Sequence, residues 1–286
     1  RPPLLRQNHA NYVPVGLAPH RRSFTSNPVQ TPLDLQSWLV HLAGPGADTF
    51  EGLLGDPVVT SQGDLWHRRA ARLEAKAVSY LKIPFGREEP TAELDRLLEV
   101  CELLDVRGLS VTAPLKYEIL NAGRVSIADD TELCAANTLR LSRAHPGQWE
   151  AIDTDEAGMK ATLAEAEKRG VEPGSVAIIG RGGVSSAVLR AIEDSSWQLA
   201  HQASGRAGWT KDAPERVTMV INAVGDSDNA YIGPPACEAW VDLHYSGVRP
   251  PPAGIKVHLN GDTFFDAQAR AQRDFWRTTT PQDGYA

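Results

Sequence analysis

The sequence contains few cysteines and none of the common metal-binding patterns. Three cysteines lie far apart, at Cys101, Cys134 and Cys237, and no CxxC or HExxH pattern occurs. We therefore expect no metal site. An odd number of scattered cysteines is typical of buried, reduced thiols and not of a disulfide framework. The cysteine usage predicts a protein of a reducing compartment.

Long hydrophobic runs and clusters of one charge sign are also missing. No segment approaches the roughly 18 apolar residues of a membrane helix, and no signal-peptide core is present. The 29 basic and 36 acidic residues give a net charge of −7 and form no basic stripe. We expect a cytoplasmic protein that binds neither membrane nor nucleic acid. Nothing in the pattern indicates an oligomeric state.

The residues that are present predict an α/β chain. Hydrophobic residues make up 42% of 286, which suffices for the core of one large domain or two small ones. We expect strands from Gly52 and at 78–83, a helix at 93–104 and a strand at 109–111. This strand, helix, strand order is typical of a parallel sheet.

The middle of the chain predicts a hairpin followed by a helix. Two short apolar stretches, 138–141 and 149–152, flank a Pro-Gly turn and read as paired antiparallel strands. A helix is expected from Gly158 to Gly170, as the passage between two domains.

A glycine turn stands between a strand and a helix in the second half. Strand 175–179 is followed by the turn 180–183 and by the helical stretch 186–192. Glycines let the backbone approach a pyrophosphate, and a helix N-terminus stabilises its charge. This context predicts a dinucleotide site, with a plain tight turn as the alternative. After the next strand, at 197–202, stands Arg206, which favours NADP because an arginine there accommodates the 2′-phosphate.

The rest of this half is short. Only about ten residues separate Arg206 from the strand expected at 217–221, so a full helix barely fits. A last clear strand is expected at 239–243, and three prolines, 250–252, follow it. The final helix, 262–276, is expected to place Gln268 on its buried face with Phe264, Ala271 and Phe275.

The stretch Gly108-Leu-Ser-Val-Thr-Ala-Pro-Leu-Lys116 organises the functional prediction. Pro114 stops strand pairing, and a loop then presents Lys116. Five further motifs follow in order: Ala135-Ala-Asn-Thr138, Ile152-Asp-Thr-Asp-Glu-Ala-Gly158, Gly180-Arg-Gly-Gly183, Val241-Asp-Leu-His-Tyr245 and Gln268-Ala269. In this order the six motifs resemble the shikimate dehydrogenase family, and the resemblance runs from about Gly52 to Trp276.

The resemblance implies a two-domain α/β fold. A substrate-binding, catalytic domain is expected at 49–157 plus 262–280, and a Rossmann-like NADP-binding domain at 158–261. The C-terminal helix would return to the first domain. Residues 1–48 match nothing and read as a tail or linker, or as the end of a fused upstream enzyme of the same pathway. Because the first residue is Arg1, we expect a piece of a longer chain or a trimmed product.

The resemblance also implies a reaction, the reversible NADPH-dependent reduction of 3-dehydroshikimate to shikimate. A general acid must lie within reach of the carbonyl oxygen, and the family assigns this role to Lys116 paired with Asp155. The substrate-binding residues would be Ser61, Thr112, Asn137, Tyr245 and Gln268. The cofactor-binding residues would be Gly180, Arg181, Gly182, Gly183, Val184, Arg206, Asn222 and Ala223.

Three departures from the family pattern leave other functions open. Gly63 replaces a hydroxyl that would hold the substrate carboxylate, and its small size makes room for quinate or a related hydroxylated cyclohexane acid. Asp153 replaces an asparagine and Glu156 a common glycine, so two negative charges face an anionic substrate unless Arg or Lys neighbours compensate. The shortened nucleotide half leaves a third alternative, a non-catalytic binding or regulatory domain descended from the enzyme.

Overall fold

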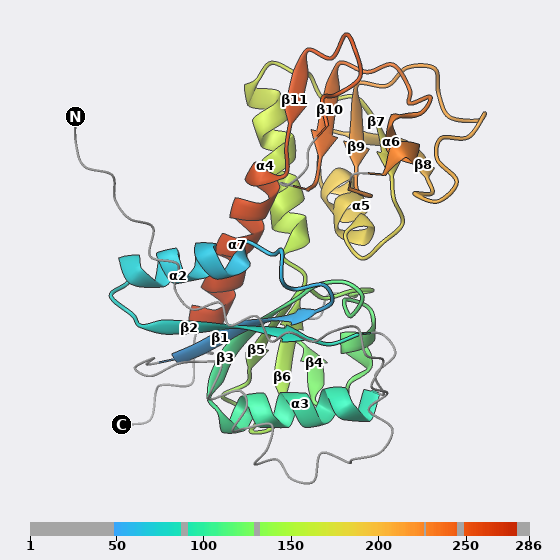
Figure 1. The fold of residues 1–286 in the computed structure, drawn as a ribbon. Helices are drawn as coiled ribbons and strands as arrows, with labels where there is room; N and C mark the ends of the chain where they lie inside the picture. The colour runs from blue at the N-terminus through green and yellow to red at the C-terminus, as the bar shows by residue number, and fades with distance from the viewer. Residues whose placement is uncertain (1–48, 87–90, 129–131, 226, 245–248, 279–286) are drawn as a thin grey trace, which may run out of the picture.

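The computed structural model describes residues 49–86, 91–128, 132–225, 227–244 and 249–278 (Figure 1). Residues 1–48 and Tyr245 therefore lie outside the described part of the chain. Two separate sheets form within these ranges, one on each side of helix α4 (Asp155–Lys168). This arrangement confirms the predicted α/β class, while the exact domain limits stay a prediction.

The first sheet has six strands in the order β2-β1-β3-β5-β6-β4. Strands β1 (Thr49–Gly55), β2 (Val78–Pro84) and β3 (Val106–Val111) are parallel, as the strand, helix, strand pattern predicts. The expected hairpin is present, because β5 (Thr138–Leu141) and β6 (Trp149–Ile152) are antiparallel. Strand β4 (Val125–Ile127), which the sequence pattern missed, pairs with the edge of β6.

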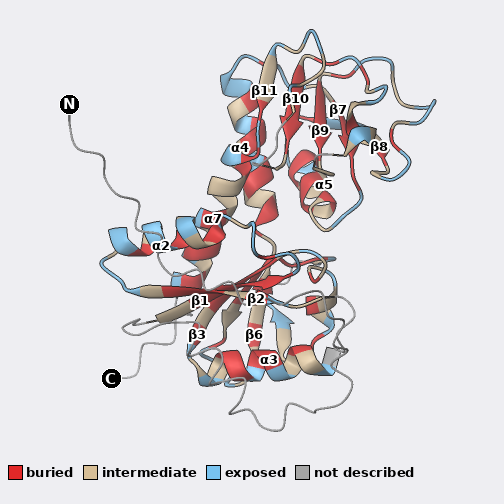
Figure 2. Cartoon of the chain, viewed as in Figure 1, coloured by how far each residue is buried: buried red, intermediate tan, exposed pale blue. Residues whose placement is uncertain are grey.

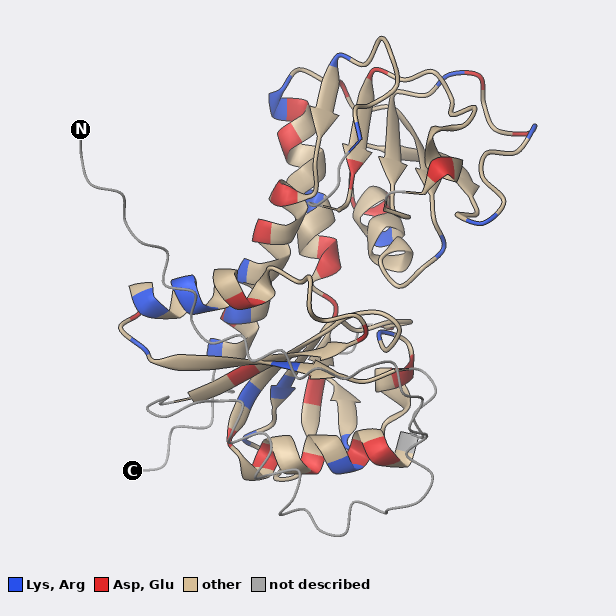
Figure 3. Cartoon of the chain, in the orientation of Figure 1, with Lys and Arg blue, Asp and Glu red and all other residues tan. Residues whose placement is uncertain are grey.

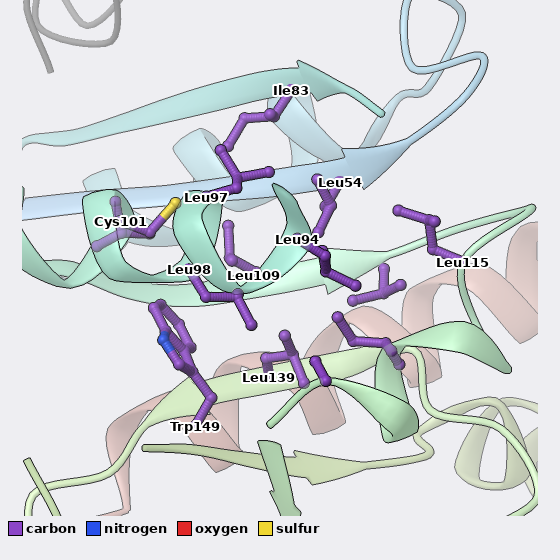
Figure 4. Close-up of a cluster of buried hydrophobic side chains, with 14 of the residues drawn as sticks. Leu54, Ile83, Leu94, Leu97, Leu98, Cys101, Leu109, Leu115, Leu139 and Trp149 are labelled. Carbon is purple, nitrogen blue, oxygen red and sulfur yellow. The ribbon is translucent and has the colours of Figure 1, made fainter. Parts of the chain in front are cut away.

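The faces of this sheet are covered by different helices. Helix α3 (Thr91–Leu103) packs on one face, where Leu97, Leu98 and Cys101 meet Leu54 and Leu109 of the strands (Figure 4). Helix α2 (Gly63–Leu73) and the C-terminal part of α7 (Asp262–Arg277) cover the other face. Side chains of successive strand residues point to opposite faces, so β1 supplies both cores.

The second sheet has five parallel strands in the order β11-β10-β9-β7-β8. Its members are β7 (Ser175–Ile179), β8 (Gln198–Ala203), β9 (Met219–Asn222), β10 (Ala239–Asp242) and β11 (Val257–Leu259). The chain runs from β7 to β8 on one side and then returns to β9 on the other. The winding direction therefore changes between β7 and β9, the position where doubly wound sheets bind ligands.

Helices cover one face of this sheet and loops the other. Helices α4 and α5 (Ser185–Glu193) pack with Met159, Val188 and Ile192 on one face. On the other face, Trp240 is packed under Trp209 and Tyr231, with no helix between β8 and β9. Only the one-turn α6 (Asp228–Tyr231) follows β9. The inner strands β7, β9 and β10 are buried despite this thin cover, whereas most of the edge strand β8 is exposed or partly exposed (Figure 2).

Helices α4 and α7 pack against each other and join the two sheets (Figure 1). Their approach depends on Gly158, where a Cβ would lie 2.7 Å from the backbone oxygen of Phe264. Helix α4 begins at Asp155, three residues before the predicted Gly158, so Asp155 belongs to the first helical turn. An acidic side chain at this position is stabilised by the positive end of the helix dipole.

Candidate functional site

Lys116 and Asp155 form a close ion pair, although 39 residues separate them in the sequence. The loop after β3 carries the lysine, and the first turn of α4 carries the aspartate. The Lys116 Nζ lies 2.5 Å from the Asp155 Oδ2, and the two side chains are 17% and 1% exposed. A protonated amine that is nearly buried and still reaches solvent can deliver a proton to a bound carbonyl oxygen.

Asn137 holds the other oxygen of this aspartate. Its Nδ2 donates to the Asp155 Oδ1 at 2.6 Å, so each carboxylate oxygen has a donor of its own. The Asn137 Oδ1 accepts from the Thr154 backbone N–H at 2.8 Å and from the Thr138 hydroxyl at 2.7 Å. These bonds fix which end of the amide faces the carboxylate, and they join the start of β5 to the start of α4.

A buried glutamine that sequence reasoning missed supports the same strand. We predicted Gln268 on the buried face of α7, but that side chain is only partly buried, and the buried residue is Gln272. The Gln272 Nε2 donates to the backbone oxygen of Asn137 at 3.3 Å. Its Oε1 accepts from the Ser110 hydroxyl at 3.1 Å and lies 3.2 Å from the His67 Nε2. Burial lowers the pKa of His67 to about 3, so the ring is a neutral member of this cluster.

The two additional acids near the pair have a cationic partner. Arg190 of α5 donates from Nη2 to the Asp153 Oδ2 at 2.8 Å and from Nε to the Glu156 Oε2 at 2.9 Å. The Asp153 Oδ1 accepts from the backbone N–H of Asp155 at 3.1 Å. Burial, together with the charge of Asp155, raises the pKa of Asp153 to about 6. Figure 3 shows acidic and basic residues together on α4 and α5.

The predicted glycine turn lies at the point where the winding of the second sheet reverses. Gly180 ends β7 with a φ of +133°, a conformation that favours glycine, and a Cβ there would lie 3.0 Å from the Cβ of Ala223 after β9. A Cβ at Gly182 would meet nothing within 4 Å. In the first turn of α5, the Ser185 hydroxyl is buried and has no hydrogen-bond partner within the described part of the chain. An open glycine turn, a helix N-terminus and an orphaned hydroxyl fit a bound pyrophosphate.

The same turn touches the ion pair. A Cβ on Gly183 would lie 2.9 Å from the Cδ of Lys116, so the glycine turn packs directly on the lysine stem. Val184 follows as the residue that precedes α5, and it packs against the core of the second sheet. Lys116 and the predicted pyrophosphate site are therefore in contact.

The other predicted cofactor residues lie at the carboxyl ends of β8 and β9. Arg181 and Arg206 are exposed, and the Arg181 Nη2 donates to the backbone oxygen of Gln202 at 3.3 Å, which places it beside the end of β8. Asn222 is fully buried, and its Nδ2 donates to the Asp242 Oδ1 at 2.7 Å. Its side chain therefore braces the loop, and Ala223 is the residue that faces the glycine turn.

The predicted carboxylate-binding turn contains one serine and a nearby tyrosine. The Ser61 Oγ accepts from the backbone N–H of Gly63 at 3.2 Å. A Cβ on Gly63 would lie 3.2 Å from the Tyr80 hydroxyl and 3.4 Å from the Ser61 Oγ. The space left by the missing serine is thus bounded by a phenol hydroxyl, which itself lies 3.1 Å from the Ser110 Oγ.

The structure brings together part of the predicted site. Lys116, Asp155 and Asn137 share one hydrogen-bond network, and Thr112 stands at the end of β3, at the start of the loop that carries Lys116. Ser61 and Gln268 lie outside this network, among the residues that the structure describes. A hollow of about 30 Å³ at the other end of β3, lined by Arg107, Arg140, Leu141, Arg143, Trp276 and Thr278, has room only for water.

Neither a metal-binding cluster nor a membrane-spanning helix is found among the described residues. They contain no group of three or more His, Cys, Asp or Glu side chains arranged to hold a metal ion. Within the same ranges, no helix combines the length and the apolar character needed to cross a membrane.

Sequence comparison finds curated relatives of one kind, although no family model matches the chain. An NADP(+) shikimate dehydrogenase of Ignicoccus hospitalis is 29% identical over 147 residues, which cover 50% of this chain and 51% of that protein. The same enzyme of an Anaeromyxobacter species (strain K) is 31% identical over 156 residues, covering 54% and 52%. The matches span about half the length of these relatives.

Solved structures share the fold over most of the chain. Shikimate 5-dehydrogenase from Thermus thermophilus, in complex with NADP(H) and shikimate, matches with a TM-score of 0.63 and 21% identity, covering 82% of this chain and 95% of that one. Quinate dehydrogenase from Corynebacterium glutamicum, in complex with NAD, gives 0.64 and 20%, covering 80% and 93%. A chorismate mutase/shikimate 5-dehydrogenase fusion from Clostridium acetobutylicum gives 0.63 and 19%, covering 80% and 91%. At these identities the likeness concerns the fold.

Proposed function

Because the chain belongs to the shikimate dehydrogenase family, we propose that it catalyses the NADP-dependent, reversible reduction of 3-dehydroshikimate to shikimate. The observation that carries the proposal is the buried Lys116–Asp155 pair in contact with the glycine turn. A proton donor beside a dinucleotide site is the arrangement that carbonyl reduction requires.

The nicotinamide cofactor, when bound, supplies the hydride. The chain supplies the proton, which Lys116 transfers from Nζ to the carbonyl oxygen of the substrate in the reductive direction and takes back in the oxidative one. Asp155 keeps the ammonium group oriented, and Asn137 keeps the carboxylate from turning. Because both carboxylate oxygens have donors, the pair is preorganised before substrate arrives.

The residues that would hold the cofactor follow from the order of the second sheet. Gly182 and the first turn of α5 would hold the pyrophosphate with backbone N–H groups and the Ser185 hydroxyl. Gly180, whose own N–H donates to the backbone oxygen of Ala203 at 3.0 Å, would shape the turn that lets the pyrophosphate approach. Arg181 and Arg206 would bind the 2′-phosphate, because guanidinium groups recognise phosphate oxygens with paired donors.

Replacing Arg206 by alanine should weaken NADPH binding selectively. Losing a hydrogen bond to a charged group costs about 1.5–3 kcal/mol, so we expect the Kd for NADPH to rise roughly ten- to a hundredfold. The Kd for NADH, which lacks the 2′-phosphate, should change little. Fluorescence titration of both cofactors measures this, with Lys211→Ala, an exposed residue of the same loop, as control. Equal losses for the two cofactors would contradict the assignment.

Quinate is the second candidate substrate, and Gly63 is the observation that favours it. Quinate differs from shikimate by an additional hydroxyl on the carbon that bears the carboxylate, so it needs room at this turn. Steady-state assays of shikimate and quinate oxidation, each with NADP and NAD, test the proposal directly. Rapid quinate oxidation without shikimate oxidation would replace the first substrate by the second. Clear NADPH binding without turnover on either acid would favour a non-catalytic domain.

Restoring the missing serine should shift the preference between the two acids. In a Gly63→Ser variant, the new hydroxyl can hydrogen-bond the carboxylate, while its Cβ, 3.2 Å from the Tyr80 hydroxyl, pushes that phenol aside by a few tenths of an ångström and narrows the space. We expect the KM for shikimate to fall by up to about tenfold and the KM for quinate to rise. Gly86→Ser is the matched control, because a Cβ there meets nothing within 4 Å. An unchanged KM ratio would place the carboxylate elsewhere.

A further inference from the structure

Asp153, two residues before Asp155, is buried against Arg190 of α5, the helix that follows β7 of the second sheet. The Asp153 side chain is 3% exposed, and its two oxygens have different donors. One accepts from the backbone N–H of Asp155, the first residue of α4, and the other from Arg190 of α5. Where the family pattern has a neutral asparagine, this chain therefore carries an ion pair that spans the two halves.

We propose that Arg190 is a positioning residue for the Lys116–Asp155 pair, acting by keeping Asp153 ionised as the acceptor that fixes the first turn of α4. The inference rests on the proposed function for its catalytic consequence. The contacts that carry it do not involve substrate or cofactor.

The surroundings of Asp153 explain why it needs this cation. Asp155 disfavours a second negative charge, whereas Lys116 favours it but is already committed to Asp155. Tyr117 also interacts electrostatically with Asp153, but its hydroxyl has no positive charge that could stabilise the carboxylate. Arg190 is thus the cation that bonds Asp153 directly, and it also bonds Glu156. A buried carboxylate without its partner becomes protonated, because ionisation in a poorly solvated site is costly.

A second contact from the same segment reinforces the link. The glycine turn that precedes α5 packs on the stem of Lys116 through Gly183, and α5 itself carries Arg190. The glycine turn therefore contacts Lys116 directly. Helix α5 is linked to Asp155 indirectly, because Arg190 bonds Asp153 and Asp153 bonds the backbone N–H of Asp155. Glu156, the second acid that Arg190 bonds, also has Lys160 as a partner, with its Oε1 2.7 Å from the Lys160 Nζ. The same Nζ lies 2.8 Å from the Asp194 Oδ2.

The test compares Arg190→Gln, Asp153→Asn and the double variant with the unmodified chain. Removing the cation should raise the pKa of Asp153 by about one unit or more. In the pH profile of kcat, the decrease on the acidic side should therefore occur at a pH that is higher by the same amount. For a shift of one unit, from about 6 to about 7, the ionised fraction of Asp153 at pH 6 falls roughly fivefold, so kcat of Arg190→Gln should be about fivefold lower there. In Asp153→Asn the amide oxygen still accepts from Asp155, so the decrease near pH 6 should vanish. The double variant should recover most of the activity lost in Arg190→Gln.

These outcomes separate positioning from a merely structural bond. A structural bond would lower kcat equally at every pH, and Asp153→Asn would not rescue it; either result overturns the proposal. Arg190→Lys keeps the charge and should shift this decrease less than Arg190→Gln. Arg169→Gln removes an exposed ion pair with Glu165 at the far end of α4 and should leave the profile unchanged.

Unfolding measurements keep the inference testable even if the enzyme proposal fails. An aspartate whose pKa is raised on folding makes the chain less stable as pH rises from about 4 to about 6. Thermal unfolding from pH 4.5 to 8 should show this loss in the unmodified chain, a loss extending to higher pH in Arg190→Gln, and a smaller one in Asp153→Asn. Identical pH dependence in all three proteins would disprove the Asp153–Arg190 linkage. Absence of turnover on both acids would disprove only the proposed function.

Discussion

Replacing Lys116 by methionine should lower kcat by about a hundred- to ten-thousandfold, the range that a positioned general acid contributes. Methionine keeps most of the packing of the lysine stem against Gly183 but carries no proton. The substrate oxygen then receives its proton from water, which is neither oriented nor held by Asp155. Because the loss concerns proton transfer, kcat should fall far more than the affinity for NADPH. Steady-state shikimate oxidation and NADPH fluorescence titration measure the two effects separately.

The control for this variant is a lysine outside the site. Lys256 forms an exposed ion pair with Glu238, so Lys256→Met should change neither kcat nor cofactor binding. Unchanged turnover in Lys116→Met would remove the lysine from the mechanism. A variant that also loses NADPH binding would instead show that Lys116 supports the glycine turn, since the two segments are in direct contact.

The strands and helices that face a core were predictable because their apolar residues repeat with a clear period. Strand β7 agrees with the predicted limits, and α5 differs by one residue at each end. The edge strand β4 was missed because a three-residue, half-exposed strand leaves no alternating pattern. Helix α4 was predicted to start too late, because its first turn carries the acidic residues Asp155 and Glu156 in place of apolar ones.

The buried polar residues of α7 were beyond prediction from its own pattern. A helical wheel with Phe264, Gln268, Ala271 and Phe275 inward places Arg273 on the opposite face and Gln272 at the flank of the apolar stripe. In the structure Gln272 and Arg273 are buried and Phe275 is only partly so. Gln272 and Arg273 are stabilised by partners that are distant in the sequence, His67 for the glutamine and Glu51 for the arginine. Burial of a polar side chain depends on such partners, and a local period does not contain them.

The charges around Asp155 were likewise only partly predictable from the sequence. The sequence indicated that Asp153 and Glu156 add negative charge, and that a cationic neighbour would be needed. Nothing in the pattern pointed to Arg190, which lies 37 residues from Asp153. The fold brings it there, because α4 and α5 pack against each other.

The buried charge cluster of α7 should dominate the stability of the first half of the chain. The Arg273 Nη1 lies 3.1 Å from the Glu51 Oε1 on β1, with side chains that are 5% and 9% exposed. Its Nε and Nη2 bond Glu74 at 2.6 and 2.9 Å. Burial raises the pKa of Glu51 even with this arginine beside it, whereas the bonds to Arg273 lower the pKa of Glu74. The arginine is therefore the group that makes an ionised Glu51 tolerable.

Replacing Arg273 by methionine should lower the free energy of unfolding by about 3–5 kcal/mol at neutral pH, because a buried carboxylate loses its partner. The loss should shrink as pH falls, since Glu51 and Glu74 become protonated and need no cation. Urea unfolding at pH 7 and pH 5 measures this dependence. A Glu51→Gln/Arg273→Met double variant should recover much of the stability, since no buried charge is left alone. Arg270→Met, which breaks only an exposed pair on the same helix, should cost at most about 0.5 kcal/mol. Equal losses in Arg273→Met and Arg270→Met would show that the buried ion pairs of Arg273 contribute no more to stability than an exposed pair does.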